Sequence, residues 1–222
     1  MSVFDIIGPV MIGPSSSHTA GAVKLGNMAR NVIGHTPERV EIVLHGSFAR
    51  TYKGHATDLA LVAGLLGMRP DDERIPQSFR IAAESGMQFR IDGGDLGDVH
   101  PNSARFSLSW QNTGAIVEGS SVGGGAVVLT GVDGFALEYT GSSHALLVFH
   151  LDRPGSVAAV TSVLAASMLN IGAMRVSRKE KGSEALMLIE VDQEIPGAVV
   201  ARVSSLEQVR RVIYFAPLED DD

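Results

Sequence analysis

The sequence contains no cysteine, and this absence narrows the chemistry that the chain can perform. Without thiols there are no disulfides and no thiolate nucleophile. Zinc or iron-sulfur clusters held by thiolates of this chain alone are excluded for the same reason. The seven histidines also lack the i, i+4 pairing around an acid that marks a helical metal site, so we expect no metal ligand in this chain. Any cluster must come from a partner.

Basic charge and long apolar runs are also scarce. The formal net charge is −7, and the few basic clusters, such as Arg178-Lys179, lie beside acids. We therefore expect binding neither to nucleic acid nor to an anionic membrane, because both require a basic surface. No apolar run reaches the roughly 18 residues of a spanning helix, and the start, MSVFDIIGPVMIG, lacks the features of a secretory signal. The expected location is the cytoplasm.

What the sequence does contain is apolar material for buried cores, since 45% of its 222 residues are hydrophobic. Spaced apolar residues predict a helix over 20–33 that ends at Gly34, preceded by a serine-rich cap. A buried strand at 41–44, the polar loop HGSFARTYKGH and a second helix at 57–67 follow. Between Phe89 and Tyr139, glycines separate short stretches that predict mostly antiparallel strands. This half is predicted to be α+β, opening with an α/β unit.

The last 75 residues or so follow another order. Strand, helix, strand, strand, helix and strand succeed one another, which predicts a ferredoxin-like β-α-β-β-α-β domain. In its first helix the apolar residues recur at spacings of three and four, and Pro154-Gly155 provides a sharp entry. We place the boundary near Gly141-Ser142-Ser143, giving domains over 1–141 and 144–218.

The first motif that points to chemistry is GPSSSHT, residues 13–19, directly before the first helix. Hydroxyls and free N–H groups at the positive end of a helix bind anions. An ordinary helix cap needs one serine, which leaves two serines, a threonine and a histidine unexplained. This segment alone favours a cradle for a carboxylate or phosphate no more than it favours a structural role.

The second motif is GSFARTYKGHATD, residues 46–58, between a strand and a helix where α/β units present ligands. Taken alone, His55 is better interpreted as a buried imidazole and Asp58 as an acid at a helix start. HPNS, residues 100–103, is by itself a proline-anchored turn, and Gly123-Gly124-Gly125 a close-packing or bulge device. The presence of two loops rich in hydrogen-bond donors in one small domain favours a binding or catalytic site over a purely structural role.

The succession GPSSSHTAG, GSFARTYKGHATD and HPNSA resembles the beta domain of bacterial iron-sulfur L-serine dehydratases over about residues 1–140. One departure is Gly21-Ala22, where the family more often has Gly-Pro. The stretch DRPGSVAAVTSVLAASMLNIGAMRVSR resembles an ACT domain. Some family members fuse the beta domain to a cysteine-bearing alpha domain and others carry the two as separate subunits. A cysteine-free chain suits the beta subunit of the separate arrangement.

The resemblance implies a lyase that converts L-serine to pyruvate and ammonia, with L-threonine left open as a substrate. It implies a 4Fe-4S cluster that is ligated by the partner alpha chain and whose open iron acts on the β-hydroxyl while a base removes the α-proton. The implied catalytic residues are Ser16, Ser17, His18 and His55. The implied substrate-binding residues are Thr19, Ser47, Lys53, Asp58 and Asn102. We expect His55 to lie closest to proton transfer, with a serine activated by histidine as the other possible base.

For the carboxyl-terminal domain, the resemblance implies edge-to-edge pairing into a homodimer and an amino-acid effector at the interface. The effector-site residues would be Asp152, Pro154, Gly155, Asn170 and Ile171. A purely structural dimerisation module is the alternative. For the whole chain the main alternative is a non-catalytic amino-acid sensor, because the first domain also resembles regulatory domains of some phosphoglycerate dehydrogenases. A third is an assembly subunit whose site residues are relics.

Overall fold

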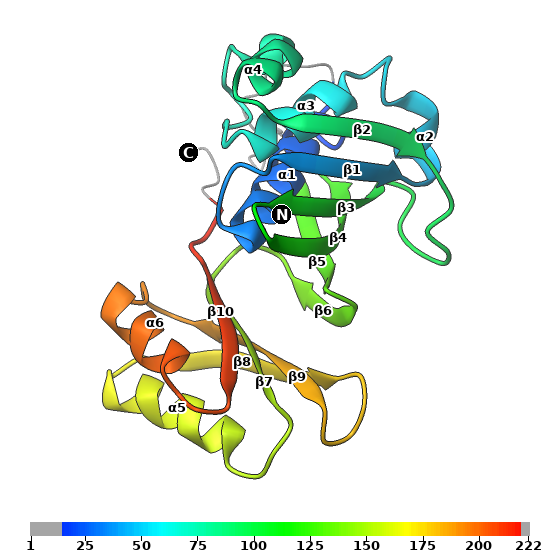
Figure 1. Cartoon of the computed structure of the whole chain (residues 1–222). Coiled ribbons are helices and arrows are strands. Elements are labelled where there is room, and N and C mark those ends of the chain that lie inside the picture. Colours follow the sequence, from blue (N-terminus) through cyan, green and yellow to red (C-terminus); the bar gives the residue numbers. More distant parts are fainter. Residues whose placement is uncertain (1–14, 219–222) are drawn as a thin grey trace. The chain divides into compact units, whose positions relative to one another are not determined.

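The computed structural model describes residues 15–218. Contacts group these residues into two compact units, each built around a sheet (Figure 1). The first unit holds the described residues up to Asp133 together with Glu138–Thr140, and the second holds Gly134–Leu137 with Gly141–Leu218. The exact boundary predicted above stays a prediction. The mixed α+β class is confirmed.

The sheet of the first unit has the strand order β2-β1-β3-β4-β5-β6. Its strands are β1 (Arg39–Leu44), β2 (Gln88–Gly93), β3 (Ser103–Trp110), β4 (Thr113–Gly123), β5 (Ala126–Val132) and β6 (Phe135–Tyr139). β1 pairs in parallel with β2, whereas the β1–β3, β3–β4 and β4–β5 pairs are antiparallel. The expectation of mostly antiparallel strands after residue 89 is therefore confirmed.

Two of the helices in this unit were predicted from apolar spacing. α1 (Ala20–Ile33) ends at Gly34, which adopts the left-handed φ of 82° that glycine tolerates best. α3 (Thr57–Leu65) follows the second motif and is apolar on nearly every face. α1 packs on β3, β4 and β5 and against α3 (Figure 1). The prediction missed α4 (Ser78–Glu84) and the 3-10 turn Ile75–Gln77 before it.

α1 and α3 cross in contact at two glycines and run in the same direction. A Cβ on Gly64 would lie 2.1 Å from the Val23 carbonyl oxygen, and one on Gly26 would lie 2.4 Å from the Leu61 carbonyl oxygen. One turn further on, the Asn27 amide donates to the Met68 carbonyl at 2.8 Å. The residues just before the two helices also meet, with the ring centroids of His18 and His55 4.8 Å apart, so α1 and α3 are parallel and their amino-terminal ends lie on the same side of the domain.

Three local expectations were wrong. The segment predicted as a polar loop contains α2 (Gly46–Thr51), which buried Phe48 anchors and whose first N–H groups the Pro101 carbonyl accepts. The serines before α1 form no side-chain cap, because Thr19 is the N-cap residue and makes no cap hydrogen bond. Of the two roles expected for Gly123–Gly125, close packing is wrong, because nothing lies within 4 Å of a Cβ added to Gly123 or Gly124. The register shift between Ser121 and Gly123 agrees with the other role, a bulge.

The second unit has the predicted β-α-β-β-α-β order, and its sheet runs β10-β7-β9-β8 with every pair antiparallel. Its elements are β7 (His144–Leu151), α5 (Ser156–Ala166), β8 (Ile171–Arg178), β9 (Glu184–Val191), α6 (Gly197–Ser204) and β10 (Val209–Phe215). Both helices lie on one face of the sheet (Figure 1), where Val160, Leu164 and Val203 are fully buried. This is the ferredoxin-like arrangement. No helix in the described part of the chain is long and apolar enough to cross a membrane.

Candidate functional site

Two histidines meet where α1 and α3 begin. His18 directly precedes the N-cap of α1, and His55 directly precedes the N-cap of α3, Ala56. Their ring centroids are 4.8 Å apart at an interplanar angle of 48°. The parallel packing of the helices brings both positive helix ends to this place, and such ends attract anions. The two sequence motifs thus form one site.

Hydrogen bonds hold the ring of His18 in one orientation. The Thr51 hydroxyl lies 3.1 Å from Nε2, the Ser15 hydroxyl lies 3.3 Å from Nδ1, and the Phe48 ring packs edge-on at 5.3 Å. Thr51 also donates its single proton to the Ser47 carbonyl at 2.8 Å. Nε2 must then be the donor towards Thr51, which leaves Nδ1 as the acceptor of the Ser15 proton. This network favours a neutral His18 paired with a serine hydroxyl.

The surroundings of His18 also disfavour its protonation. The pKa of His18 is lowered from the ordinary value of 6.5, mainly by burial and to a smaller extent by repulsion from His55. A histidine that remains neutral near pH 7 keeps a lone pair with which to accept a proton.

Unsatisfied polar atoms concentrate in this part of the molecule. Among residues 15–218, six buried side-chain nitrogen or oxygen atoms lack a hydrogen-bond partner. Three of them belong to the two motifs, one to the turn 100–103 and one to β4. These five are Thr19 Oγ1, His55 Nδ1, Thr57 Oγ1, Asn102 Oδ1 and Ser121 Oγ. Each such atom costs roughly 1–3 kcal/mol if it stays unpaired. Their clustering indicates that a polar ligand completes them.

Neighbouring elements close around the histidines. Ser121 on β4 lies under the first turn of α1, because a Cβ on Gly21 would come within 2.1 Å of its Oγ. The Ser121 N–H donates to the Asn102 carbonyl at 2.9 Å, and the Ser47 N–H donates to the Pro101 carbonyl at 2.7 Å. The turn 100–103, which taken alone was interpreted as structural and in which the resemblance implied a substrate-binding Asn102, therefore connects β4 to α2 beside the histidines.

Not every predicted residue joins this cluster. Lys53 is exposed, with its ammonium 5.7 Å from the centre of the Tyr52 ring, and Asp58 accepts the N–H of its neighbour Leu59 at 2.9 Å, as an acid at a helix start does. Ser16 and Ser17 are partly buried in the turn before α1, where the Ser16 carbonyl accepts the Gly21 N–H. Gly13 and Pro14, the first two residues of the motif, lie outside the described residues.

Four residues at the site were not predicted: Ser15, Thr51, Thr57 and Ser121. Ser15 and Thr51 belong to the motifs, and their spacing of three and four residues from His18 and Ser47 was a usable signal. Ser121 belongs to an ordinary strand pattern, so its place depends on tertiary packing.

The predicted effector residues lie in two separate places. Asp152, after β7, accepts the Gly182 N–H at 2.9 Å and an Arg178 N–H at 3.3 Å. These hydrogen bonds, with the positive charge of Arg178, hold the pKa of Asp152 below its ordinary value. Pro154 and Gly155 lead into α5, for which Gly155 is the N-cap with φ 88°.

The other two effector residues follow α5. Asn170 donates to Asp192 at 2.6 Å, and Ile171 begins β8 opposite Val191. Val191 pairs with the first residue of β7, whereas Asp152 follows the last. The two groups therefore lie at opposite ends of the sheet in one chain.

The site offers imidazoles, hydroxyls and an amide. Among residues 15–218 there is no group of three His, Cys, Asp or Glu side chains that could hold a metal ion, and the sequence has no thiol. Hydroxyls and neutral imidazoles suit a small polar substrate but do not suit an iron-sulfur cluster, which requires thiolates. The hydroxyl and imidazole side chains of this site are therefore suited to contact a substrate and not to ligate a cluster.

Comparisons with known proteins show the family to which the chain is similar. Residues 2–91 match the family described as "Serine dehydratase beta chain", and residues 144–208 match the ACT domain. The probable L-serine dehydratase beta chain of Bacillus subtilis is 46% identical over 217 residues, which cover 97% of this chain and 98% of that protein. The L-serine dehydratase beta chain of Peptoniphilus asaccharolyticus is 37% identical over 215 residues, covering 96% and 97%.

A more distant relative carries a similar region in a longer chain. D-3-phosphoglycerate dehydrogenase of Methanocaldococcus jannaschii is 24% identical over 195 residues, which cover 86% of this chain and 36% of that protein. The near full-length identity with the two beta chains decides the family. This chain belongs to the L-serine dehydratase beta-chain family and carries a carboxyl-terminal ACT domain.

Proposed function

We propose that this chain is the beta subunit of an iron-sulfur L-serine dehydratase, which deaminates L-serine to pyruvate and ammonia together with a cysteine-bearing alpha chain. The observation that carries the proposal is the pair of histidines at two converging positive helix ends, surrounded by buried polar atoms without partners. The names of the two full-length relatives support it. A cytoplasmic location is part of the same proposal.

The substrate carboxylate is assigned to the start of α1. Ser16 and Ser17 lie in the turn before the helix, and Thr19 holds an unpaired buried hydroxyl at the N-cap. Hydroxyl donors combined with a helix dipole stabilise a carboxylate without a full positive charge. Ser121 and Asn102 contribute further unpaired atoms from the sheet side, suited to the substrate ammonium or hydroxyl.

Two groups are placed to move the α-proton. His55 has an unpaired, buried Nδ1 that can accept a proton directly. The Ser15 hydroxyl, which donates to Nδ1 of His18, is the alternative, because His18 can take the serine proton as the serine takes the substrate's. When bound to the alpha chain, a 4Fe-4S cluster would supply a Lewis-acidic iron that makes the β-hydroxyl a better leaving group.

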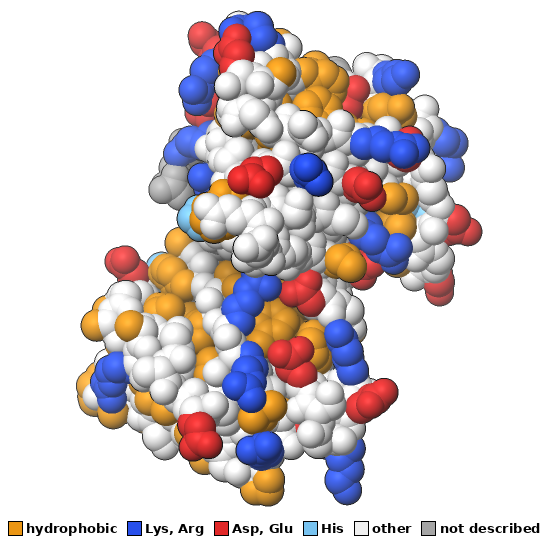
Figure 2. All heavy atoms as spheres, viewed as in Figure 1, with side chains coloured by type: hydrophobic (Ala, Val, Ile, Leu, Met, Phe, Trp, Pro, Cys, Tyr) orange, Lys and Arg blue, Asp and Glu red, His pale blue; other side chains and the backbone are white. Residues whose placement is uncertain are grey.

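The ACT domain is assigned to homodimer formation and to effector binding. β8 is an edge strand of its sheet, and Met174 and Val176 on it are 43% and 44% exposed. Hydrophobic side chains interspersed with Lys and Arg are visible on the surface of this unit in Figure 2. An edge strand presents unpaired backbone groups that a second copy can satisfy. The two halves of the effector site, which are far apart in one chain, would then come together across the dimer.

The decisive experiment is anaerobic co-purification with a cysteine-bearing L-serine dehydratase alpha chain from the same source, followed by a pyruvate assay. We expect the isolated beta chain to be colourless and inactive, because it lacks thiolates, and the pair to be brown and active on L-serine. A brown, active preparation of this chain alone would overturn the proposal that the alpha chain holds the cluster. A clustered pair that bound but did not convert L-serine would favour the sensor hypothesis.

A further inference from the structure

A second pocket, of about 440 Å³, opens in the first unit away from the histidines. Thr36, three residues after the end of α1, lines it, whereas His18 precedes the start of α1. Fourteen residues of α-helix span about 20 Å at roughly 1.5 Å per residue. The pocket is therefore separate from the histidine site, and its size falls in the range of small-molecule sites.

The backbone around this pocket includes the carboxyl ends of helices, whose dipoles favour positive charge. Leu66 is the C-cap residue of α3 and Ser85 that of α4, so the carboxyl ends of these helices meet at the pocket together with that of α1. Exposed helix carbonyls attract cations. The carboxylate of Glu38 adds a full negative charge on the pocket wall, and Trp110 presents an aromatic ring to the same space. An ammonium group suits this part of the pocket.

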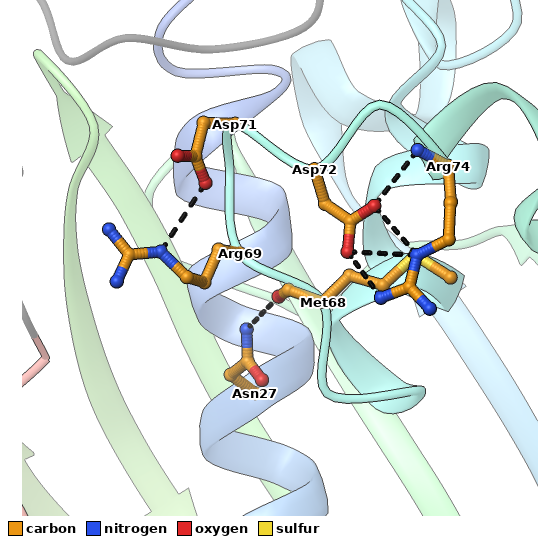
Figure 3. A network of polar contacts seen from close by, with 6 residues as sticks. All are labelled: Asn27, Met68, Arg69, Asp71, Asp72 and Arg74. Atoms are coloured by element: carbon orange, nitrogen blue, oxygen red, sulfur yellow. Dashed lines mark hydrogen bonds and ion pairs between the residues drawn. The ribbon is translucent and has the colours of Figure 1, made fainter.

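Arg74 is the positive side chain that lines the pocket, and Arg30 donates through Nε to the lining residue Thr36 at 3.5 Å. Asp72 holds Nε of Arg74 at 2.9 Å and its Nη2 at 2.6 Å (Figure 3). Within residues 15–218, Nη1 of Arg74 makes no hydrogen bond, so this N–H group is fixed in place and available to a carboxylate. Nearby, the Asn27 amide donates to the Met68 carbonyl and thereby fixes the wall of the pocket (Figure 3).

The remaining surface is apolar. Leu66, Met68 and Ile81 line the pocket together with the ring of Trp110. We propose that this pocket binds an α-amino acid with an apolar side chain. Its ammonium faces Glu38 and the helix carbonyls, its carboxylate meets Nη1 of Arg74, and its side chain packs on these apolar residues. The site requires neither the alpha chain nor turnover, so the inference stands apart from the dehydratase function.

The chain contains a single tryptophan, which makes the test direct. Trp110 lines the pocket, and the His35 ring stacks on it at 3.6 Å, so its emission reports on occupancy of this pocket. The purified full-length chain is titrated with L-leucine, with 3-methylbutylamine, which lacks the carboxylate, and with 4-methylpentanoate, which lacks the amine. We expect a saturable change in emission with L-leucine and at least tenfold weaker binding of the other two.

Variants locate the binding. Glu38→Gln and Arg74→Ala should each weaken L-leucine binding about tenfold or more, whereas Arg80→Ala, which removes an arginine paired with Glu84 outside the pocket, should bind as the parent does. Circular dichroism checks whether each variant is folded. If Arg74→Ala does not fold, the nearly isosteric Glu38→Gln variant still tests the proposal. The proposal is overturned by binding in calorimetry without a change in Trp110 emission, by equal affinity for the amine alone, or by no saturable binding of L-leucine.

Discussion

Two buried hydroxyls at helix starts, one in each unit of the chain, differ in their hydrogen bonding. Ser156, at the start of α5 in the ACT domain, is buried and donates to the Leu151 carbonyl at 2.8 Å. Thr19, at the start of α1, is equally buried, but its hydroxyl has no partner among the described residues. The position is satisfied internally in α5 and left open in α1. Ser78, at the start of α4 in the first unit, is again satisfied, because its hydroxyl donates to the Leu59 carbonyl at 2.9 Å.

This difference separates a self-sufficient module from a binding site. The ACT domain leaves one buried atom unpaired within the described residues, His150 Nε2, and it lies alone. The first unit leaves five buried polar atoms unpaired. Their missing hydrogen bonds cost several kcal/mol of stability, which a substrate that pairs with them can recover on binding. The following predictions test whether the first unit is indeed the one built around a ligand.

The largest effect is expected at the crossing of α1 and α3. Gly64→Ala places a methyl group 2.1 Å from the Val23 carbonyl oxygen, which only a shift of backbone relieves. We expect a loss of about 3 kcal/mol or more in the free energy of unfolding, measured by urea denaturation. Gly197→Ala is the matched control in α6, where nothing lies within 4 Å of an added Cβ, and it should raise stability by about 0.5 kcal/mol. Equal effects of the two changes would show that the helices are not packed as described.

The next effect concerns turnover. In the assembled enzyme, His55→Ala should lower kcat about a hundredfold, the range typical of a lost acid-base group, with cluster content unchanged. The control is His144→Ala in the ACT domain, whose Nδ1 contacts the Tyr214 hydroxyl at 2.7 Å, and it should leave kcat within about threefold. If His55→Ala turned over as fast as the control, the catalytic assignment would be wrong and Ser15→Ala would become the decisive variant.

A smaller effect is expected for substrate binding. Ser17→Ala removes a hydroxyl assigned to the substrate carboxylate, a contact made in the ground state and in the transition state alike. It should therefore raise KM about tenfold and leave kcat nearly unchanged. Ser177→Ala, which removes a hydroxyl bonded to the Ala136 carbonyl, is the control in the second unit. A fall in kcat at constant KM would instead place Ser17 in the proton-transfer chemistry.

The smallest effect is a shift in the pKa of His18. In His55→Gln the repulsion between the two rings is lost, so the pKa of His18, measured by NMR titration of the isolated chain, should rise while remaining lowered by burial. In the parent protein the unfolded state binds a proton near pH 6.5 and the folded state only at lower pH. His18 therefore contributes stability above about pH 6.5, and this contribution is lost as the pH falls. An unchanged pKa in the variant would mean that the rings do not interact.

Much of the fold was predictable because periodicity follows burial. α1 was predicted with its end, since apolar spacing stops where Gly34 allows a left-handed residue. α2 was missed because Phe48 is the single buried residue in a polar helix of six. The histidines became candidates through the resemblance of their two motifs to a known family, whereas Ser121 could not be predicted, because nothing in a strand pattern reveals which helix will cover it.

The contact between Gly26 and Gly64 also limits how this family can diverge. A side chain at either position moves α3 away from α1, and the start of α3 carries His55 away from His18. Exposed residues on both helices can vary, but these two positions are coupled and lie outside both sequence motifs. A homologue that keeps every motif residue and lacks one of these glycines is expected to have lost the geometry of the pair, and its sequence alone would still suggest an intact site.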